Sequence, residues 1–307
     1  MESRYSYKET LNSGEKSGSE SKTSSMEWHM RFDRAHIVVL LLAVIALPIM
    51  PAYGQWLNHP DARIPRMEDG KPNLTAPAPR VNGKPAVAGL WQAEKTPAWE
   101  YDSVLGNGFR DLQVDTHDIT KYALNVFWGM KEEPLRPEAA SILKHRLESP
   151  LEFPLTQCLP AGVPLALLVF TFRIIETPQE ILMLSETADP PRQIHTDGRL
   201  LPPNPDPTWM GHSVGRWDGD TLVIDTIGVN ERAWLDLFGH PRSESMHITE
   251  RYHRRDFGHM DLEMIFDDPK YYTRPFTIKT GLTLIPDSDL LEYVCNENEK
   301  DRLHLGN

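Results

Sequence analysis

The chain has 307 residues, of which 40% are hydrophobic and 25% are charged, and its 44 acidic residues outnumber 32 basic residues for a formal net charge of −12. This acidic balance, without any long basic run, excludes nucleic-acid binding through a global positive field. A chain of this length can bury one large core or two small ones.

The first residues do not belong to the folded body. Residues 1–30 are interpreted as a disordered or over-extended N-terminal segment, because Met1–Met26 is rich in Ser, Glu and Lys and has no apolar periodicity. Arg31 and Arg34 follow, and then an apolar run of 14 residues, Ile37–Met50. This run is short for a membrane span and typical of the core of a signal peptide.

A signal peptide is therefore predicted over residues 31–54. Pro51 breaks the apolar helix, and the small residues Ala52 and Gly54 suit cleavage before Gln55. An uncleaved membrane anchor is the alternative, and it is the only membrane association expected. The protein is predicted to be periplasmic or secreted.

Two cysteines, Cys158 and Cys295, follow the predicted signal peptide. In an oxidising compartment they can form a disulfide, which would tie the end of the chain to the start of its β-rich part. Two buried free thiols are the alternative. The sequence contains no CxxC motif, so it indicates neither a redox site nor a zinc site of that kind.

Residues 55–157 are interpreted as a Pro-rich strap followed by a helical region. Asp69–Pro72 and Asn82–Pro85 each combine a turn dipeptide with a proline, which predicts a turn followed by extended chain. Apolar spacing predicts a helix within Asp118–Gly129. A second helix is predicted over Arg136–Ser149, with a proline in its first turn and another proline after its end.

Residues 158–307 are interpreted as an antiparallel β domain. The chain is expected to form a mainly β fold, an antiparallel meander that closes into a lipocalin-like barrel or remains a strongly curved sheet. Gly, Pro, Asn and Asp punctuation separates nine predicted strands: Leu165–Ile175, Glu180–Glu186, Pro191–Thr196, His212–Trp217, Thr221–Thr226, Met246–Arg255, His259–Asp267, Phe276–Ile285 and Leu290–Cys295.

The first of two predicted hairpins turns at Asp218-Gly219. Counting back from this turn pairs Trp217 with Asp220 and His212 with Asp225. A carboxylate opposite a histidine fixes its tautomer and stabilises its charged form, as a general base requires. An ordinary cross-strand polar pair on a solvated face is the more common arrangement.

The second hairpin turns at Asp256-Phe257-Gly258, a three-residue loop with glycine last. The resulting register gives one face of matched charges, such as Arg251 with Glu263 and His253 with Asp261. The opposite face is apolar. On it Tyr252 pairs with Leu262, Glu250 with Met264 and Ile248 with Phe266. His247, His253 and His259 fall on the charged face, which favours a solvated ladder over a metal site.

Glu250 is the one acidic residue on the apolar face, so it is the leading candidate for a functional group. A buried carboxylate has a raised pKa or a partner. Arg199, Arg216 or Arg254 is the expected cation, and an internal ion pair is the structural alternative to a ligand-binding role. Tyr252, His195, Arg199 and Trp217 are the further candidate ligand-binding residues, and Glu250, His212 and Asp225 are the candidate catalytic residues.

Residues 211–223, GHSVGRWDGDTLV, resemble a signature of a large group of exported hypothetical proteins from soil bacteria, Acidobacteria among them. Arg192–Arg199, Thr249–Tyr252, Glu292–Cys295 and the segment from Gly70 to Trp91 are similar to the same group. The resemblance implies export but no particular activity. Gly89-Leu90-Trp91 is also similar to the Gly-x-Trp strand of the calycins, which implies ligand binding inside a barrel.

The leading hypothesis is an exported β-barrel protein that binds a small, partly apolar ligand. The alternatives are a hydrolase or isomerase that uses Glu250 or a His212–Asp225 pair as acid or base, and an envelope-associated interaction protein. No phosphate-binding loop or dinucleotide motif predicts a cofactor, and no metal is expected.

Overall fold

The computed structural model describes residues 60–97, 99–101, 119–187, 189–295 and 297. The predicted N-terminal segment 1–30 and signal peptide 31–54 lie outside these residues. The chain from residue 53 onward forms one compact unit. Within the described ranges, none of the helices combines the length and the apolar character needed to cross a membrane.

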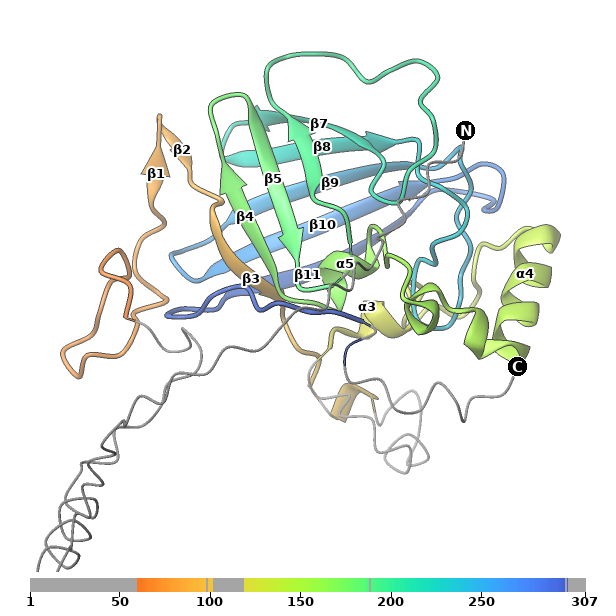
Figure 1. Cartoon of the computed structure of the whole chain (residues 1–307), viewed down its shortest axis with the longest axis horizontal. Coiled ribbons are helices and arrows are strands. Elements are labelled where there is room, and N and C mark those ends of the chain that lie inside the picture. Colours follow the sequence, from red (N-terminus) through yellow and green to blue (C-terminus); the bar gives the residue numbers. More distant parts are fainter. Residues whose placement is uncertain (1–59, 98, 102–118, 188, 296, 298–307) are drawn as a thin grey trace, which may run out of the picture. The chain divides into compact units, whose positions relative to one another are not determined.

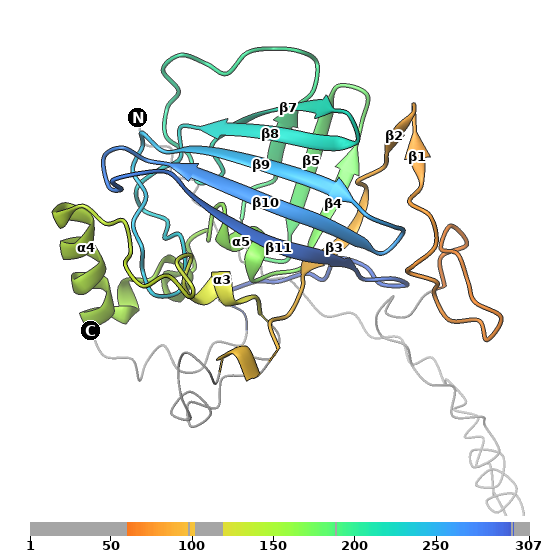
Figure 2. The same ribbon diagram turned by 180° about the vertical axis from the view of Figure 1, so that it is seen from behind.

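Nine strands close into a barrel, which confirms the predicted mainly β fold and the barrel alternative over the curved sheet (Figures 1 and 2). The sheet is mixed rather than the predicted antiparallel meander, because β6 and β7 are parallel. Around the barrel the order is β10-β11-β3-β4-β5-β6-β7-β8-β9. Among the described residues, each strand of the barrel therefore has a partner on both sides. The strands are β3 (Gly89–Ala93), β4 (Phe172–Glu176), β5 (Glu180–Ser185), β6 (Arg192–His195), β7 (His212–Asp218), β8 (Thr221–Ile227), β9 (His247–Arg254), β10 (His259–Asp267) and β11 (Phe276–Leu284).

Two of the predicted strands are corrected. Leu165–Ile175 begins with a helical turn, α5 (Leu165–Leu168), and only its end joins β4. A run that is apolar on every residue has no period of two, so it does not distinguish a buried helix from a strand. Leu290–Cys295 forms no strand, and β3 supplies the ninth strand instead by pairing with β4 and β11.

The predicted helix over Arg136–Ser149 is confirmed as α4 (Pro137–Glu148). Of the helix predicted within Asp118–Gly129, only α3 (Lys121–Leu124) forms among the described residues. It ends because the side chain of Asn125 accepts a hydrogen bond from Phe127 N at 2.7 Å, which replaces a helical bond by a local turn. Two 3₁₀ turns, η3 (Pro150–Glu152) and η4 (Pro154–Gln157), follow α4.

The Pro-rich strap forms the two predicted turns. Asn82 and Gly83 both have positive φ and connect β1 (Arg80–Val81) to β2 (Lys84–Pro85), as expected of an Asn-Gly hairpin. This small hairpin is bound to the turn between β7 and β8. Arg80 forms an ion pair with Asp220 at 2.7 Å, and Lys84 donates a hydrogen bond to the Gly219 carbonyl.

Large apolar side chains fill the barrel. Trp91, Phe172, Tyr252 and Phe266 are all fully buried there. The predicted disulfide between Cys158 and Cys295 is present, with Cα atoms 5.5 Å apart. It connects η4 to the segment that follows β11.

Candidate functional site

A groove lies on the outer face of the barrel at the β6–β7 pair. These two strands run parallel, whereas the other paired strands of the described barrel are antiparallel. Parallel neighbours need a long connection, because the chain must return to the end at which the first strand began. Here the connection comprises residues 196–211, and it arches over the barrel in Figures 1 and 2.

The floor of the groove follows from strand alternation. Ile194 pairs with Ser213, and His195 pairs with Val214. Arg192 and Ile194 are buried in the barrel, so Gln193 and His195 point outward. His212 and Val214 are the outward residues of the neighbouring strand, and together these four side chains form the floor.

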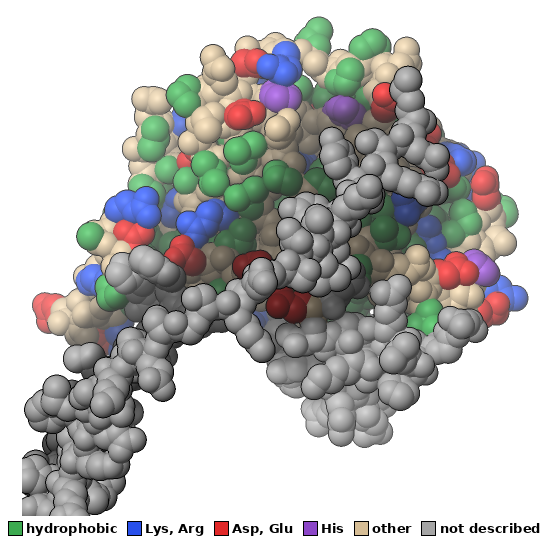
Figure 3. Space-filling model, viewed as in Figure 1, with side chains coloured by type: hydrophobic (Ala, Val, Ile, Leu, Met, Phe, Trp, Pro, Cys, Tyr) green, Lys and Arg blue, Asp and Glu red, His purple; other side chains and the backbone are tan. Residues whose placement is uncertain are grey.

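The groove encloses about 500 Å³, within the range of small-molecule sites. Its walls come from the two prolines before β6 and from the 196–211 connection. The lining residues are mostly apolar with a few polar groups: Pro190, Pro191, Gln193, His195, Arg199, Leu200, Leu201, Pro202, Thr208, Trp209, Met210, Gly211, His212, Ser213 and Val214. In the view of Figure 3, histidine side chains lie near the top of the molecule, beside acidic, basic and hydrophobic side chains.

Hydrogen bonds anchor the second half of the connection. Thr208 pairs with Val229: the Thr208 amide donates to the Gly228 carbonyl, and the Thr208 carbonyl accepts from Asn230 N. The Asp206 carbonyl accepts a hydrogen bond from His212 Nε2 at 2.9 Å, which fixes the proton of that ring on Nε2. Arg242 donates to the Trp209 carbonyl at 2.9 Å. Leu200, in the first half, is 89% exposed.

A second group of polar side chains lies inside the barrel. Arg192 Nη1 donates to Glu250 Oε2 at 2.9 Å, and neither side chain is exposed. Arg192 also bonds Thr226 and Ser213, whose hydroxyls lie 2.9 Å apart. Tyr252 donates to the same Glu250 oxygen at 3.0 Å. Glu250 therefore forms an internal ion pair, the structural alternative considered from the sequence.

The electrostatics of this interior cluster follow from burial and charge pairing. Burial raises the pKa of Tyr252 well above its ordinary value, and the neighbouring Glu250 charge adds to the effect. Burial alone would lower the pKa of Arg192, but the charge of Glu250 outweighs it and raises that pKa. Glu250 Oε1 is buried and has no hydrogen-bond partner among the described residues.

The cation expected beside Glu250 was predicted wrongly. Arg199 pairs with Asp197, and Arg216 pairs with Asp225, both on the outside of the barrel. Arg254 points inward but lies over the Trp91 ring, 5.0 Å from its centroid, and donates to backbone carbonyls, among them that of Ala86. Arg192 was missed because its partner lies three strands away in the barrel. Counting from a turn pairs residues on two adjacent strands only.

The predicted register of the first hairpin is also wrong, by two residues. Asp218 pairs with Thr221, so the turn consists of Gly219 and Asp220, with Gly219 at φ +57°. A turn with glycine in its first position requires positive φ only of the glycine, whereas a turn centred on Asp218-Gly219 requires it of both residues. A shift of two keeps every side chain on its predicted face.

The predicted pair of His212 and Asp225 does not form as a result. His212 pairs with Ile227. Asp225 instead accepts hydrogen bonds from Arg216, from His247 Nε2 at 3.1 Å and from Thr249 at 2.8 Å. Burial alone would raise the pKa of Asp225, but the bonds from Arg216 and Thr249 outweigh it and lower the pKa. The proposed acid–base pair therefore lacks its geometry.

The register of the second hairpin is confirmed. Asp261 pairs with His253, Glu263 with Arg251, Leu262 with Tyr252 and Met264 with Glu250. Glu250 and Tyr252 are fully buried, as the apolar face predicted.

The candidate residues thus divide between the two faces of the sheet. Glu250 and Tyr252 lie inside the barrel, and Trp217 packs partly buried against the same core. His195, Arg199 and His212 line the outer groove. Two regions therefore replace the single site expected, and of these two the groove lies on the outside, whereas the Glu250 cluster is fully buried.

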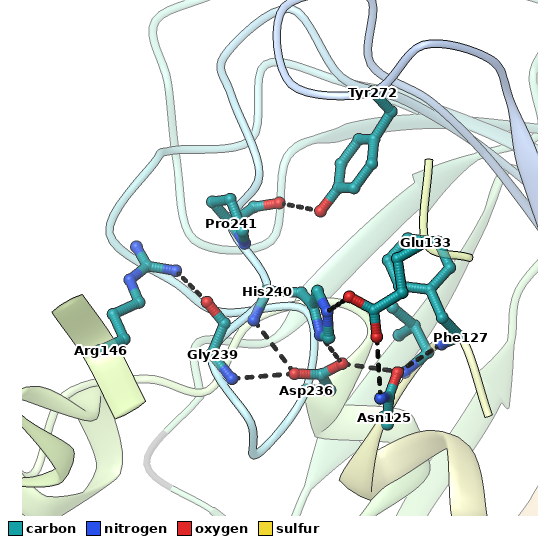
Figure 4. A network of polar contacts seen from close by, with 10 residues as sticks. Asn125, Phe127, Glu133, Arg146, Asp236, Gly239, His240, Pro241 and Tyr272 are labelled. Atoms are coloured by element: carbon teal, nitrogen blue, oxygen red, sulfur yellow. Dashed lines mark hydrogen bonds and ion pairs between the residues drawn. The ribbon is translucent and has the colours of Figure 1, made fainter. Parts of the chain in front are cut away.

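A third polar network was not predicted from the sequence (Figure 4). His240 Nδ1 lies 2.5 Å from Asp236 Oδ2, and its Nε2 lies 3.1 Å from Glu133 Oε2. Asp236 also accepts backbone bonds from Val126 and Gly239. The Asp236–His240 spacing was a usable signal, but Glu133 lies more than a hundred residues away. The network holds the β8–β9 connection against the segment after α3.

Burial alone would lower the pKa of His240, but Asp236 and Glu133 outweigh it and raise the pKa to about 9. His240 is therefore a buried cation between two carboxylates. This arrangement links two segments of the chain and does not expose a reactive group. Within the described residues, no group of three or more His, Cys, Asp or Glu side chains is arranged to hold a metal ion.

Comparison with known proteins gives no relative: the chain matches no family model, and neither a curated protein nor a solved structure is significantly similar to it.

Proposed function

We propose that this protein is exported and that it binds a small, partly apolar molecule in the groove over β6 and β7. The single observation that carries the proposal is the groove itself, about 500 Å³ in volume, with apolar walls and a few polar side chains at its floor and rim. That composition is typical of small-molecule sites.

The groove suits a ligand better than the barrel interior does. Large side chains such as Trp91 and Phe172 fill the barrel, and the polar groups beside Glu250 bond mainly to one another. Two of the segments that resemble the exported bacterial group, Arg192–Arg199 and residues 211–223, contribute seven of the groove residues. These are Gln193, His195, Arg199, Gly211, His212, Ser213 and Val214.

Export is supported by two observations of different kinds. The sequence of residues 31–54 is typical of a signal peptide. The disulfide between Cys158 and Cys295 is a bond that persists in oxidising compartments. A binding protein outside the cytoplasm agrees with both.

Native mass spectrometry of protein purified from the exported fraction tests the proposal. We expect a small molecule to be retained, and we expect Val214→Trp to lose it, because a large ring on the groove floor fills the space. Ile265→Trp is the matched control, since Ile265 is a β-branched residue on the outer face of β10 away from the groove. If Val214→Trp retains the molecule as well as Ile265→Trp does, the site is contradicted. The site is also contradicted if the parent protein and both variants retain no molecule.

A further inference from the structure

The groove contains no acidic side chain, although the chain carries 44 Asp and Glu residues against 32 Lys and Arg. Its polar lining instead includes His195, Arg199 and His212. In a strongly acidic protein, a small-molecule groove that is lined by basic groups and by no carboxylate favours an anion.

Three of the acidic residues close to the groove have partners, and a fourth, Asp206, is an exposed residue of the 196–211 connection. Asp197 forms an ion pair with Arg199 at 2.6 Å, and Glu180 lies 4.0 Å from His195 Nδ1. Asp189 accepts hydrogen bonds from Gly162 N and Thr187. The Arg199 bonds to Asp197 use Nε and Nη2, so Nη1 remains available to a ligand.

Arg242 adds a positive charge behind the groove. Its fully buried guanidinium donates to the carbonyls of Trp209, Asn230 and Val163, and it forms no ion pair with a carboxylate among the described residues. The charge of Asp189 acts on Arg242 without forming an ion pair, so only part of its positive field remains at the backbone of Trp209, which lines the groove.

Arg232 places a further cation on the same tryptophan. Its guanidinium lies over the Trp209 ring, 4.9 Å from the centroid, and the residue is exposed. Trp209 lines the groove, Arg232 lies over its ring and Arg242 bonds its backbone carbonyl, but neither arginine is among the lining residues. The remaining walls are aliphatic, with Leu200, Leu201 and Met210 among them.

We infer that the ligand of the groove is an amphiphilic anion, in which a carboxylate or sulfonate is attached to an apolar body. The anionic group meets Arg199, the arginine among the lining residues, and the apolar body packs on the aliphatic walls. This inference rests on the proposed function, because it names the chemical class of ligand for the same groove.

Two fluorescent probes of matched shape test the charge preference. Anilinonaphthalenesulfonate has one sulfonate on a naphthalene that also bears an anilino group, and N-phenylnaphthylamine has the same rings without the charge. With disulfide-bonded protein, we expect the sulfonate to bind at least about tenfold more tightly, which is a difference of roughly 1.4 kcal/mol. Raising NaCl from about 0.05 M to about 0.5 M should weaken the sulfonate alone.

Variants locate the preference in the groove. Arg199→Gln and Arg232→Gln should each reduce the ratio of the two affinities by about threefold, the size expected for an exposed charge contact. Arg251→Gln is the matched control, because Arg251 is an arginine on the outer face of β9, paired with Asp218 away from the groove. It should leave the ratio unchanged. Val214→Trp should abolish binding of both probes.

The outcomes separate this inference from the proposed function. Equal affinities of the two probes, both lost in Val214→Trp, would overturn the anion preference and retain the groove as a binding site. A sulfonate preference that Arg251→Gln lowers as much as Arg199→Gln does would place the anion elsewhere and overturn the inference. Failure of both probes to bind the parent protein would count against the inference and the groove alike.

Discussion

Arg192 on β6 and Glu250 on β9 form an ion pair across the interior of the barrel, with Nη1 2.9 Å from Oε2 and both side chains fully buried. Strands β7 and β8 separate the two residues in the order of the sheet. The pair therefore ties together parts of the barrel that share no backbone hydrogen bonds.

Removal of one partner should destabilise the protein strongly. Glu250→Gln keeps the shape of the side chain but leaves Arg192 as a buried, unpaired charge, so we expect a loss of about 3–5 kcal/mol in the free energy of unfolding. The double variant Arg192→Met with Glu250→Leu should cost less than Glu250→Gln, because it removes both charges. Urea unfolding gives the free energy of unfolding of the parent protein and the two variants. A double variant less stable than Glu250→Gln would show that the pair itself supplies the stability.

Loss of the disulfide should lower stability without removing the barrel. Cys158 and Cys295 are 137 residues apart, and in the chain-entropy model a bridge over such a loop stabilises by about 5 kcal/mol. We expect Cys158→Ser to unfold at lower urea than the parent and to be insensitive to reductant. Mass spectrometry before and after reduction gives the direct check, and finding both thiols free in protein purified without reductant would contradict the bridge.

Stability should fall between pH 6.5 and about pH 9 through His240. The folded pKa of about 9 lies above the ordinary value of 6.5, so the bonds to Asp236 and Glu133 contribute fully below pH 6.5. The contribution is lost as the pH rises through the folded pKa, and a shift of this size corresponds to about 3 kcal/mol.

The His240 contribution can be isolated by comparing unfolding free energies at pH 6 and pH 9. The difference between the two should be smaller in His240→Gln than in the parent protein. His253→Gln is the control, because His253 is an exposed histidine of the outer face of β9. An NMR titration in which the His240 ring deprotonates near pH 6.5 would contradict the buried cation.

The turn between β7 and β8 should depend on Gly219 rather than on Asp220. Gly219 has φ +57°, and among the described residues other than its two chain neighbours no atom lies within 4 Å of an added Cβ, so Gly219→Ala introduces backbone strain without a clash. We expect a loss of about 1–2 kcal/mol. Asp220→Ala removes only the exposed bond to Arg80 and should cost less. A larger effect of Asp220→Ala in thermal unfolding would contradict the observed register.

Local patterns determined much of the barrel. Alternation along residues 247–267 set the register of the second hairpin and placed Glu250 inside, because side chains on a strand alternate with a period of two. The first hairpin was placed on the right faces but two residues out of register, because Asp218, Gly219 and Asp220 offer two turns of similar sequence. The pairing of Cys158 and Cys295 was predicted from their number and from the predicted signal peptide.

Tertiary structure alone decided the partners of those residues. Arg192 meets Glu250, and Glu133 meets His240, only because the closed barrel and its connections bring distant segments together. The groove likewise depends on the parallel pairing of β6 and β7, which requires the long connection that forms its wall. The sequence alone determined which face each side chain occupies, since alternation is a property of a single strand. Closure of the barrel determined which faces meet, since contacts between strands far apart in the chain follow from the pairing of all nine.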